Sequence, residues 1–432
     1  MKNRLQALTE KMVYVVDGAR TPFLKMRAEG GPFSASDLAV GAARNLARKY
    51  VAPEEFDQVV VGCVGPSEEE ANIARIISLR LGCGNNVPAW TVQRNCASGL
   101  QSIDSAAQSI AMRQCQLVLA GGTEAMSRSP LLLSRNMVRW LAHFRQAKQL
   151  PQKFKSLLAF RPQYIVPIIS LLKGLTDPVV NLTMGQTAEE LAFRFHVTRE
   201  EMDEFSVHSH QRVIAGQAAG DFEEIVPLYG NDGTVYEQDE GVRADSSVEK
   251  LSKLKSAFEK FGNITAGNSS QISDGAAFVI LASEDAVKQY DLPVLARIVD
   301  VQWAALDPTI MGLGPIHAMA PLLVRQQLTL DDIDHLEINE AFAAQVIACQ
   351  RAWVDKKYYK DVLGLTSALG EIADDRLNPQ GGAIALGHPV GASGARLVLH
   401  CGKMMEKNRT KRAIASLCIG GGQGGAILLE RV

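Results

Sequence analysis

The stretch GGAIALGHPVGASGAR, residues 381–396, decides the fold because its ASG tripeptide occurs twice in the chain. The first copy, Ala97-Ser98-Gly99, lies within NCASGLQSI, and the second is Ala392-Ser393-Gly394. In both places the tripeptide opens a helical pattern, which is followed by an apolar strand-like run and then by consecutive glycines. Chance similarity between glycine-rich turns is the weaker explanation, because the tripeptide keeps its position relative to helix and strand. We therefore interpret the chain as two related halves.

The repeated order of strand, glycine-bearing turn, helix and strand predicts an α/β protein with sheets covered on both faces. Two such halves packed together predict a layered α/β/α/β/α body in which the equivalent turns meet near a pseudo-two-fold axis. We expect the first half to span residues 1–282 and the second 283–432. The first half carries an inserted loop domain at about 127–262, and a shorter insertion covers about 353–378. Insertions at matching sheet ends usually build the substrate cleft.

The composition limits the possible function classes. The chain has 432 residues, 47% of them apolar and 21% charged, which is typical of a globular protein of two or three domain-sized units. A net charge of -2 gives no sign of a nucleic-acid partner. The seven cysteines form no CxxC pattern, so we expect neither a metal site nor disulfides. MKNRLQALTEKM at the start has no apolar core of a signal peptide, which favours a cytoplasmic location.

Cys96 and His388 are the first candidates for chemistry. Cys96 stands just before the helix that Ser98 and Gly99 begin, and a helix N-terminus lowers the pKa of a nearby thiol. His388 lies just before the second ASG, so the repeat would bring the two side chains face to face, with the imidazole as base. A core thiol and a structural histidine are the alternatives. The internal symmetry favours the catalytic interpretation for His388, while Cys96 taken alone leaves both open.

Cys418 ends the last apolar run in SLCIGGGQGGAILLE. The glycines after it leave backbone N–H groups bare, as an oxyanion hole requires, although a tight turn needing positive φ is the alternative. Asn339 and Glu340 follow the apolar run 336–338, where polar groups mark either a helix cap or a site. A loop rich in small residues at 265–277 suits an amide-bearing ligand or a plain connection equally well.

With these residues assembled, the chain resembles the thiolase family over nearly its whole length. The resemblance rests on NCASGLQSI around Cys96, NEAFAAQ at 339–345, and GGAIALGHPVGASGAR followed by CIGGGQGGA. It implies the thiolase fold, in which two βαβαβαββ halves form a five-layered body with a loop domain inserted in the first half. It also implies thiolysis of 3-ketoacyl-CoA to acetyl-CoA and a shortened acyl-CoA, and the reverse Claisen condensation.

The resemblance further implies a role for each site residue. Cys96 would be the nucleophile that becomes an acyl thioester, His388 its base, and Cys418 the second acid/base. Asn339 would hold a water in one oxyanion hole, and the amides of Cys96 and Gly420 would form the other. Four further positions match the substrate and CoA path: Ser270, Arg243, Phe342 and Met184. Coenzyme A enters as a substrate, and the resemblance implies no cofactor and no metal.

Within the family, the long insertions look most like the thiolase subunit of fatty-acid β-oxidation complexes. Thr183-Met184-Gly185 lacks the His that short-chain acetoacetyl-CoA thiolases place before Met-Gly, whereas Asn339 and CIGGG resemble those soluble enzymes. Biosynthetic acetoacetyl-CoA thiolase therefore stays an alternative. A decarboxylating ketoacyl synthase, which would use two histidines, and a non-catalytic lipid-binding homologue fit less well. We expect a homodimer or homotetramer, with a β-oxidation hydratase/dehydrogenase subunit as a further partner.

A basic and apolar segment at residues 125–176 interrupts the near-neutral chain. It has no Asp or Glu and nine cations, interleaved with aromatic and aliphatic residues. This mixture suits a peripheral membrane contact or an acidic partner, and a solvated cover over the substrate tunnel that partly serves the CoA phosphates is an equal alternative.

Overall fold

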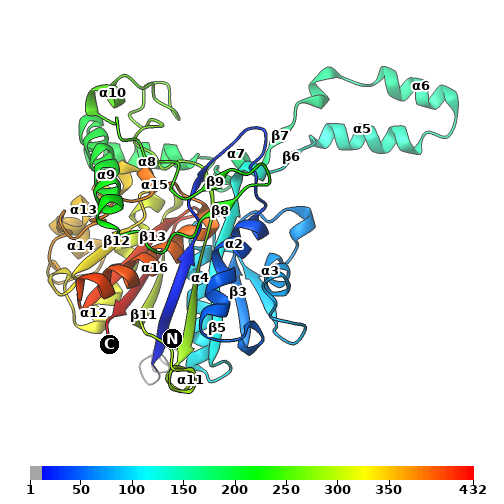
Figure 1. Cartoon of the computed structure of the whole chain (residues 1–432). Coiled ribbons are helices and arrows are strands. Elements are labelled where there is room, and N and C mark those ends of the chain that lie inside the picture. The colour runs from blue at the N-terminus through cyan, green and yellow to red at the C-terminus, as the bar shows by residue number, and fades with distance from the viewer. Residues whose placement is uncertain (1–11) are drawn as a thin grey trace.

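A computed structural model of the chain describes residues 12–432, so the absence of a signal peptide, expected from residues 1–12, lies almost wholly outside the described part. The first half contains the βαβαβαββ order that the resemblance implied (Figure 1). Its elements are β1 (Val13–Arg20), α2 (Ala35–Lys49), β3 (Gln58–Gly62), α3 (Ile73–Leu81), β4 (Ala89–Val92), α4 (Ser98–Ala111), β5 (Leu117–Ala125) and β10 (Ser273–Ser283). The short β2 (Leu24–Lys25) pairs with β10.

The second half repeats this order with one strand reduced. Its elements are β11 (Ala296–Ala305), α12 (Gly314–Gln326), β12 (His335–Ile338), α13 (Ala343–Val354), α16 (Val390–Asn408), β13 (Arg412–Ile419) and β14 (Gln423–Glu430). Where the first half has β4, the second has a single parallel bridge between Leu336 and Leu377. The helix α11 (Glu284–Tyr290) connects the halves.

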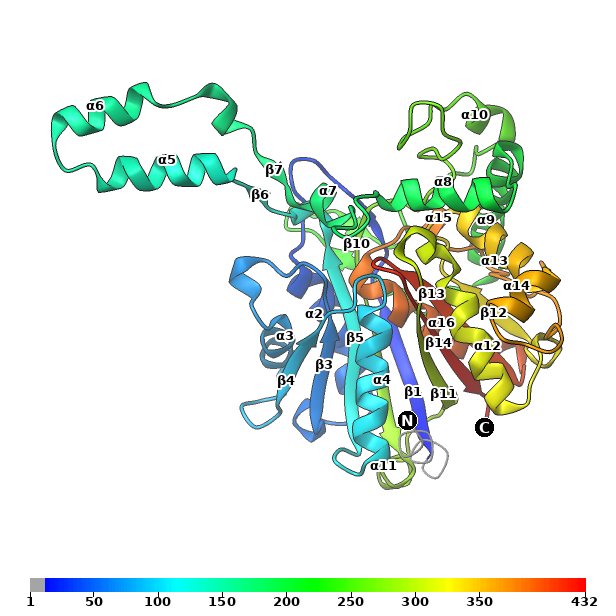
Figure 2. The same cartoon turned by 180° about the vertical axis from the view of Figure 1, so that it is seen from behind.

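The strands of both halves form one continuous run in the order β12-β13-β14-β11-β1-β10-β5-β3-β4. The halves join where β1 pairs antiparallel with β11, from Val13 opposite Ile298 to Val15 opposite Ala296. Helices α4 and α16 pack against each other between the two parts of the sheet, α2 and α3 cover the outer face of the first half, and α12 covers that of the second (Figures 1 and 2). This is the predicted five-layered arrangement.

The two ASG turns meet at the centre of the molecule. A Cβ atom on Gly99 would lie 2.8 Å from the carbonyl oxygen of Gly391, and one on Gly394 would lie 2.6 Å from the nitrogen of Leu100. Side chains cannot fit at either distance, so glycine is what allows α4 and α16 to touch. The structure therefore confirms that the equivalent turns come together.

The inserted segments form several smaller elements. Those of the first half are β6 (Leu131–Leu132), α5 (Arg135–Gln146), α6 (Leu150–Leu158), β7 (Ile168–Ile169), α7 (Ser170–Gly174), α8 (Met184–Arg194), α9 (Arg199–Ala219), β8 (Leu228–Tyr229), β9 (Val235–Tyr236) and α10 (Val248–Ser252). The second half adds α14 (Lys356–Asp361) and α15 (Ala383–Leu386). Helices α5 and α6 project from the body as an arm, whereas α8 and α9 lie on it (Figure 2).

Local sequence sets most boundaries, and two differ from expectation. Thr183 and Thr198 cap α8 and α9 through capping boxes with Gln186 and Glu201. Residues 273–277, expected in a loop, belong to β10, because residues 274–277 pair with β5 and Ser273 pairs with Lys25 of β2. Helix α16 begins at Val390, before the ASG tripeptide that was expected to open it, so Ser393 lies in its first turn.

Candidate active site

Cys96 lies in the turn between β4 and α4, at the centre of the fold. Asn95 has a left-handed backbone (φ 45°), and Ala97 caps α4, so Cys96 stands just before the first helical residue. The Asn95 amide Nδ2 donates to the carbonyl oxygen of Gly420 at 2.8 Å. This bond holds the β13–β14 turn against the thiol.

Burial raises the pKa of the Cys96 thiol, and hydrogen bonds from the backbone N–H groups of Gly420 and Cys96 oppose that effect. The backbone N–H groups thus act in the direction expected of a helix N-terminus, but burial outweighs them and the net shift of the pKa is upward. The resting group is a neutral thiol that needs a base. The same two N–H groups are the pair predicted for an oxyanion hole, and the structure places both at the sulfur.

His388 lies between α15 and α16, and its ring is held by a short chain of hydrogen bonds. Nδ1 is 2.6 Å from the Ser393 hydroxyl, which itself donates to the carbonyl oxygen of Pro389 at 3.0 Å. Because a hydroxyl has one proton to donate, Ser393 accepts from Nδ1–H, and Nε2 keeps its lone pair. The backbone N–H of His388 donates to Gln271. The ring is therefore fixed in the tautomer that can take a proton at Nε2.

Burial, aided by the charge of Arg396, lowers the pKa of His388 to about 4. At neutral pH the imidazole is uncharged. A neutral imidazole whose Nε2 keeps its lone pair is the form that can accept a proton from a thiol.

Asn339 comes directly after β12 and is fully buried. Its Nδ2 lies 3.5 Å from His388 Nε2, and its backbone N–H donates to Ser416 at 2.9 Å. Within residues 12–432, Asn339 Oδ1 has no hydrogen-bond partner although it is buried. The Asn339 side-chain oxygen is therefore available to accept a hydrogen bond, close to the His388 ring. Glu340, the next residue, is instead used structurally and bonds to Ser209 and Asn378.

Cys418 lies inside β13, next to the last residue of the strand. Burial and then the nearby charge of Cys96 raise the pKa of the Cys418 thiol well above its ordinary value. Cys418 packs with Phe342 and Ile384 in an apolar cluster that Met184 borders. A buried second thiol next to the first is placed to give a proton and to take one back.

The glycines after Cys418 serve both of the functions considered for them, at different positions. Gly421 (φ 91°) and Gly422 (φ 75°) need the left-handed backbone of the tight β13–β14 turn. Gly420 instead contributes its N–H to Cys96, and a Cβ atom there would meet the sulfur of Met184 at 3.1 Å. Cys96, Gly420 and Met184, three of the nine predicted site positions, thus lie close together at the β13–β14 turn.

The structure brings three of the four predicted substrate-path residues together. Ser270 donates its N–H to Ala341, one residue before Phe342, and the Phe342 ring packs edge to face against Phe258 with 5.9 Å between centroids. Phe258 also packs over the start of α8, next to Met184. Arg243 is exposed, and within the described part of the chain its side chain makes no hydrogen bond or ion pair with the thiol site.

Sequence reasoning missed three residues that support the site: Ser393, Asn95 and Glu124. Ser393 had a usable signal, since it stands in the turn right after His388. Glu124, at the end of β5, accepts hydrogen bonds at 2.9 Å from the backbone of Val64 and Gly65, and burial raises its pKa to about 7. Nothing in the sequence marked it, because the strands that surround it come from distant segments.

The chain is similar to known proteins over nearly its full length. Residues 13–285 match the family model described as thiolase, N-terminal domain, and residues 292–431 match thiolase, C-terminal domain. The mitochondrial 3-ketoacyl-CoA thiolase of Mus musculus is 40% identical, covering 97% of this chain and 98% of the relative. A beta-ketoadipyl-CoA thiolase of Acinetobacter baylyi is 39% identical, covering 98% of this chain and 100% of the relative.

Solved structures agree with the fold. Human mitochondrial 3-ketoacyl-CoA thiolase aligns with a TM-score of 0.83 and 36% identity, covering 98% of this chain and 100% of that one. Bacillus anthracis acetyl-CoA acetyltransferase aligns with a TM-score of 0.84 and 35% identity, covering 98% and 99%. The predicted fold of two repeated halves is confirmed.

Proposed function

Because the chain belongs to the thiolase family of acyltransferases, we propose that it cleaves 3-ketoacyl-CoA with coenzyme A, and also catalyses the reverse condensation. The products are acetyl-CoA and an acyl-CoA shortened by two carbons. The observation that carries this proposal is the surroundings of Cys96, where two backbone N–H groups converge on the sulfur and a second buried thiol, Cys418, lies close enough to be affected by its charge. His388, a neutral imidazole of fixed tautomer, supplies the base.

In the first half-reaction, His388 Nε2 takes the proton of Cys96, and the thiolate attacks the ketone carbon of the substrate. The N–H groups of Cys96 and Gly420 stabilise the resulting oxyanion. The bond between the ketone carbon and the neighbouring carbon then breaks, which leaves an acyl thioester on Cys96 and the enolate of acetyl-CoA. Cys418 protonates the enolate carbon. The side chains of His388 and Asn339 hold the enolate oxygen, Asn339 through a water.

In the second half-reaction, Cys418 takes the proton of an incoming CoA thiol, and the CoA sulfur attacks the acyl thioester. The bond to Cys96 breaks, and the proton on His388 returns to its sulfur, so the site is restored. The high pKa values of both thiols fit this cycle, because each group must hold its proton until the step that needs it.

The apolar residues Met184 and Phe342 would line the path to the thiols, with Ser270 beside them. Exposed Arg243 would meet the CoA phosphates at the rim, where a mobile cation in contact with solvent suffices. We favour 3-ketoacyl-CoA substrates longer than acetoacetyl-CoA, and a relative with 40% identity over 98% of its length is named as a 3-ketoacyl-CoA thiolase. Thr183 in place of the short-chain His supports the same choice.

A thiolysis assay tests this function. The purified chain is supplied with CoA and, in turn, with acetoacetyl-CoA, a long-chain 3-ketoacyl-CoA and 3-ketoadipyl-CoA. We expect cleavage of the long-chain substrate and loss of at least about 10⁴-fold in kcat for Cys96→Ala. Cys115→Ala, a half-buried thiol at the far end of α4, is the matched control and should keep wild-type activity.

Activity that survives Cys96→Ala would overturn the mechanism. A preference for acetoacetyl-CoA would instead support the biosynthetic alternative, and condensation that requires loss of CO2 from a malonyl thioester would indicate a decarboxylating synthase. Absence of all activity in a folded protein would indicate a lipid-binding homologue.

We further propose that the projecting arm, residues 131–169, attaches the protein to an anionic membrane surface. None of the residues of α5 and α6 is buried, and within the arm there is no carboxylate to oppose its cations. Its large exposed apolar side chains are Leu131, Leu132, Leu133, Val138, Leu150, Phe154, Leu157, Leu158, Ile165, Val166, Ile168 and Ile169. No helix in the described part of the chain has the length and apolar character of a membrane span. The mixture of cations and exposed apolar side chains on the arm is what suits a peripheral contact.

The arm is also an ordered structure in its own right. Trp140 stacks on Phe144 and packs edge to face on Phe160, and its indole N–H donates to Ser156 at 2.8 Å. These contacts hold α5 against α6, so the apolar residues outside them are left free for a lipid surface rather than used in a core. This favours attachment over a simple cover of the substrate tunnel.

A cytoplasmic location and assembly as a homodimer or homotetramer complete the proposal, with a hydratase/dehydrogenase subunit as a further partner. The edge strand β4, where Trp90 is 38% exposed, is open to pairing with a second copy. Sedimentation equilibrium of the purified chain tests the assembly, since a monomer at micromolar concentration would contradict it.

A further inference from the structure

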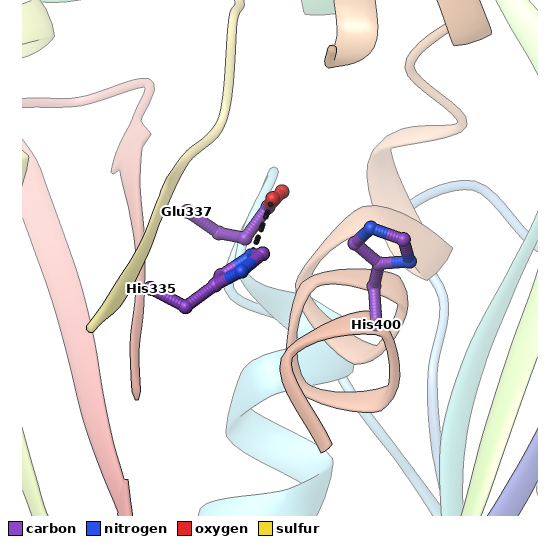
Figure 3. Close-up of side chains that lie close together, drawn as sticks. All are labelled: His335, Glu337 and His400. Carbon is purple, nitrogen blue, oxygen red and sulfur yellow. Dashed lines mark hydrogen bonds and ion pairs between the residues drawn. The ribbon is translucent and has the colours of Figure 1, made fainter. Parts of the chain in front are cut away.

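A buried group of two histidines and a glutamate lies away from the thiol site, between β12 and α16. His335 and Glu337 come from β12, and His400 faces them from α16 (Figure 3). One possible ligand atom from each lies within 4.8 Å of the other two, and none of the three residues is more than 4% exposed. The proposed thiolase reaction makes no use of these residues.

The hydrogen bonds around the group leave one ring nitrogen free. His335 Nε2 contacts Glu337 Oε1 at 3.0 Å, and His400 Nδ1 contacts Glu224 Oε1 at 3.2 Å. His400 Nε2, however, is buried without a partner in the described part of the chain. An imidazole whose Nδ1–H is held by a carboxylate presents the lone pair of Nε2, and this is the usual second contact of a metal-binding histidine.

The charges favour a cation here. Ion pairs join Glu337 to Arg396, and join Glu224 and Asp239 to Arg20. These ion pairs set three buried carboxyl groups, those of Glu337, Glu224 and Asp239, against two guanidinium groups, those of Arg396 and Arg20. Arg396 contacts Glu337 Oε2, which leaves Oε1 on the side of His335.

We propose that His335, Glu337 and His400 bind a divalent transition-metal ion of the zinc type. Two imidazoles and one carboxylate are a common donor set for zinc, with bonds of about 2.0–2.2 Å. Ligand atoms in such a site lie about 3.3 Å apart, so small side-chain rotations from the present positions close it around the ion. Such a site would go beyond the sequence analysis, in which the cysteine spacing and the family resemblance gave no reason to expect a metal.

The ion would be structural rather than catalytic. It would connect β12, which ends one residue before Asn339, to α16, which starts two residues after His388. Through Glu224 and Arg20 it would also reach β1 of the first half. A single ion would thus brace the two elements that carry the base and its neighbouring amide.

Metal titration of the full chain tests the proposal. The thiols of the active site could themselves bind zinc, so the parent protein is Cys96→Ala/Cys418→Ala, dialysed against EDTA and then incubated with Zn²⁺ or Co²⁺. We expect one tightly bound Zn²⁺ per chain, and a Co²⁺ complex whose spectrum shows d–d bands without a thiolate charge-transfer band. His335→Gln and His400→Gln should each weaken Zn²⁺ binding by more than about 100-fold.

His317→Gln is the matched control, because His317 is a partly buried histidine that bonds to Tyr358, outside the group. It should bind Zn²⁺ with the affinity of the parent. No stoichiometric binding by the parent would overturn the proposal, and so would a thiolate band in the Co²⁺ spectrum. If the histidine variants do not fold, the stoichiometry and the Co²⁺ spectrum of the parent still decide the matter, independently of any thiolase activity.

Discussion

The thiol site and the arm, residues 131–169, differ in how far their functional side chains are exposed to solvent. At the site, Cys96, His388 and Cys418 are enclosed by packed strands and helices, and burial moves every pKa toward the neutral form. On the arm, cations and apolar side chains stand together in solvent. Proton transfer between the thiols and the imidazole requires a buried environment that shifts their pKa values. Attachment to a charged membrane surface instead requires exposed cations and apolar side chains. If the two regions act independently, a change in one should leave the function of the other intact.

Among the variants that keep the Cys96 thiol, His388→Asn should have the largest effect on the site. Removing the base leaves a Cys96 thiol whose pKa is already raised by burial, so we expect kcat to fall by about 10² to 10⁴-fold. Steady-state thiolysis measures it, and the amount of acyl-enzyme formed in a single turnover shows which step is lost. Binding to anionic vesicles should not change. A variant with near-normal kcat would show that another group deprotonates Cys96.

The buried imidazole also predicts how stability depends on pH. His388 has a pKa of about 4 when folded and about 6.5 when unfolded, so below pH 6.5 the unfolded chain binds a proton that the folded chain does not. The stabilisation present above pH 6.5 is lost as the pH falls toward 4, by roughly 3 kcal/mol. Urea unfolding at several pH values measures this, and His388→Asn should show a shallower loss over the same range. Identical pH profiles for the two proteins would contradict the assignment.

Neutralising the arm should separate attachment from catalysis. Near an anionic bilayer each cation contributes about 1 kcal/mol, so Arg135→Gln/Arg139→Gln/Arg145→Gln should weaken binding to phosphatidylserine vesicles by roughly 100-fold. Thiolysis of a soluble substrate should stay within about twofold of wild type. Vesicle sedimentation measures the binding.

The matched control places the same change on the body. Lys356, Lys357 and Lys360 are exposed cations on α14, and replacing all three by Gln should leave vesicle binding unchanged. Equal losses for both triple variants would mean that net charge, rather than the arm, determines binding.

Ser393→Ala should give the smallest effect. The hydroxyl only fixes the tautomer and orientation of His388, so we expect about a tenfold loss in kcat with little change in KM. Ser393→Thr, which keeps the hydroxyl, should restore part of the activity. A variant that loses KM and kcat together would indicate a structural role instead.

Much of the fold was predictable because its signal is local. The two ASG turns and the strands after them are readable in order, and the glycines that mark them are required where α4 crosses α16. Helix starts are local too, since Thr183 caps α8 and Thr198 caps α9 through neighbouring residues. The prediction of a loop at 273–277 was wrong, because only the pairing with β5 shows that these small residues form a strand.

The residues of the site could be predicted from the sequence, but their pKa values could not. Cys96, His388, Asn339 and Cys418 stand in recognisable motifs, yet the direction of the Cys96 pKa depends on burial by segments far away in the chain. The same holds for Glu124, and for the pairing of His335 with His400 across two elements. Arg243, predicted from a matching position, lies exposed and apart from the thiols.

The sequence by itself determined the two halves, the order of their elements and the residue types available at the turns, because backbone preferences and hydrophobic periodicity act over short distances. Only the tertiary structure decided which distant side chains share a buried space, which protonation state each holds there, and that residues 131–169 leave the body as an arm. Desolvation depends on everything packed around a group, and that environment is assembled only when the chain is folded.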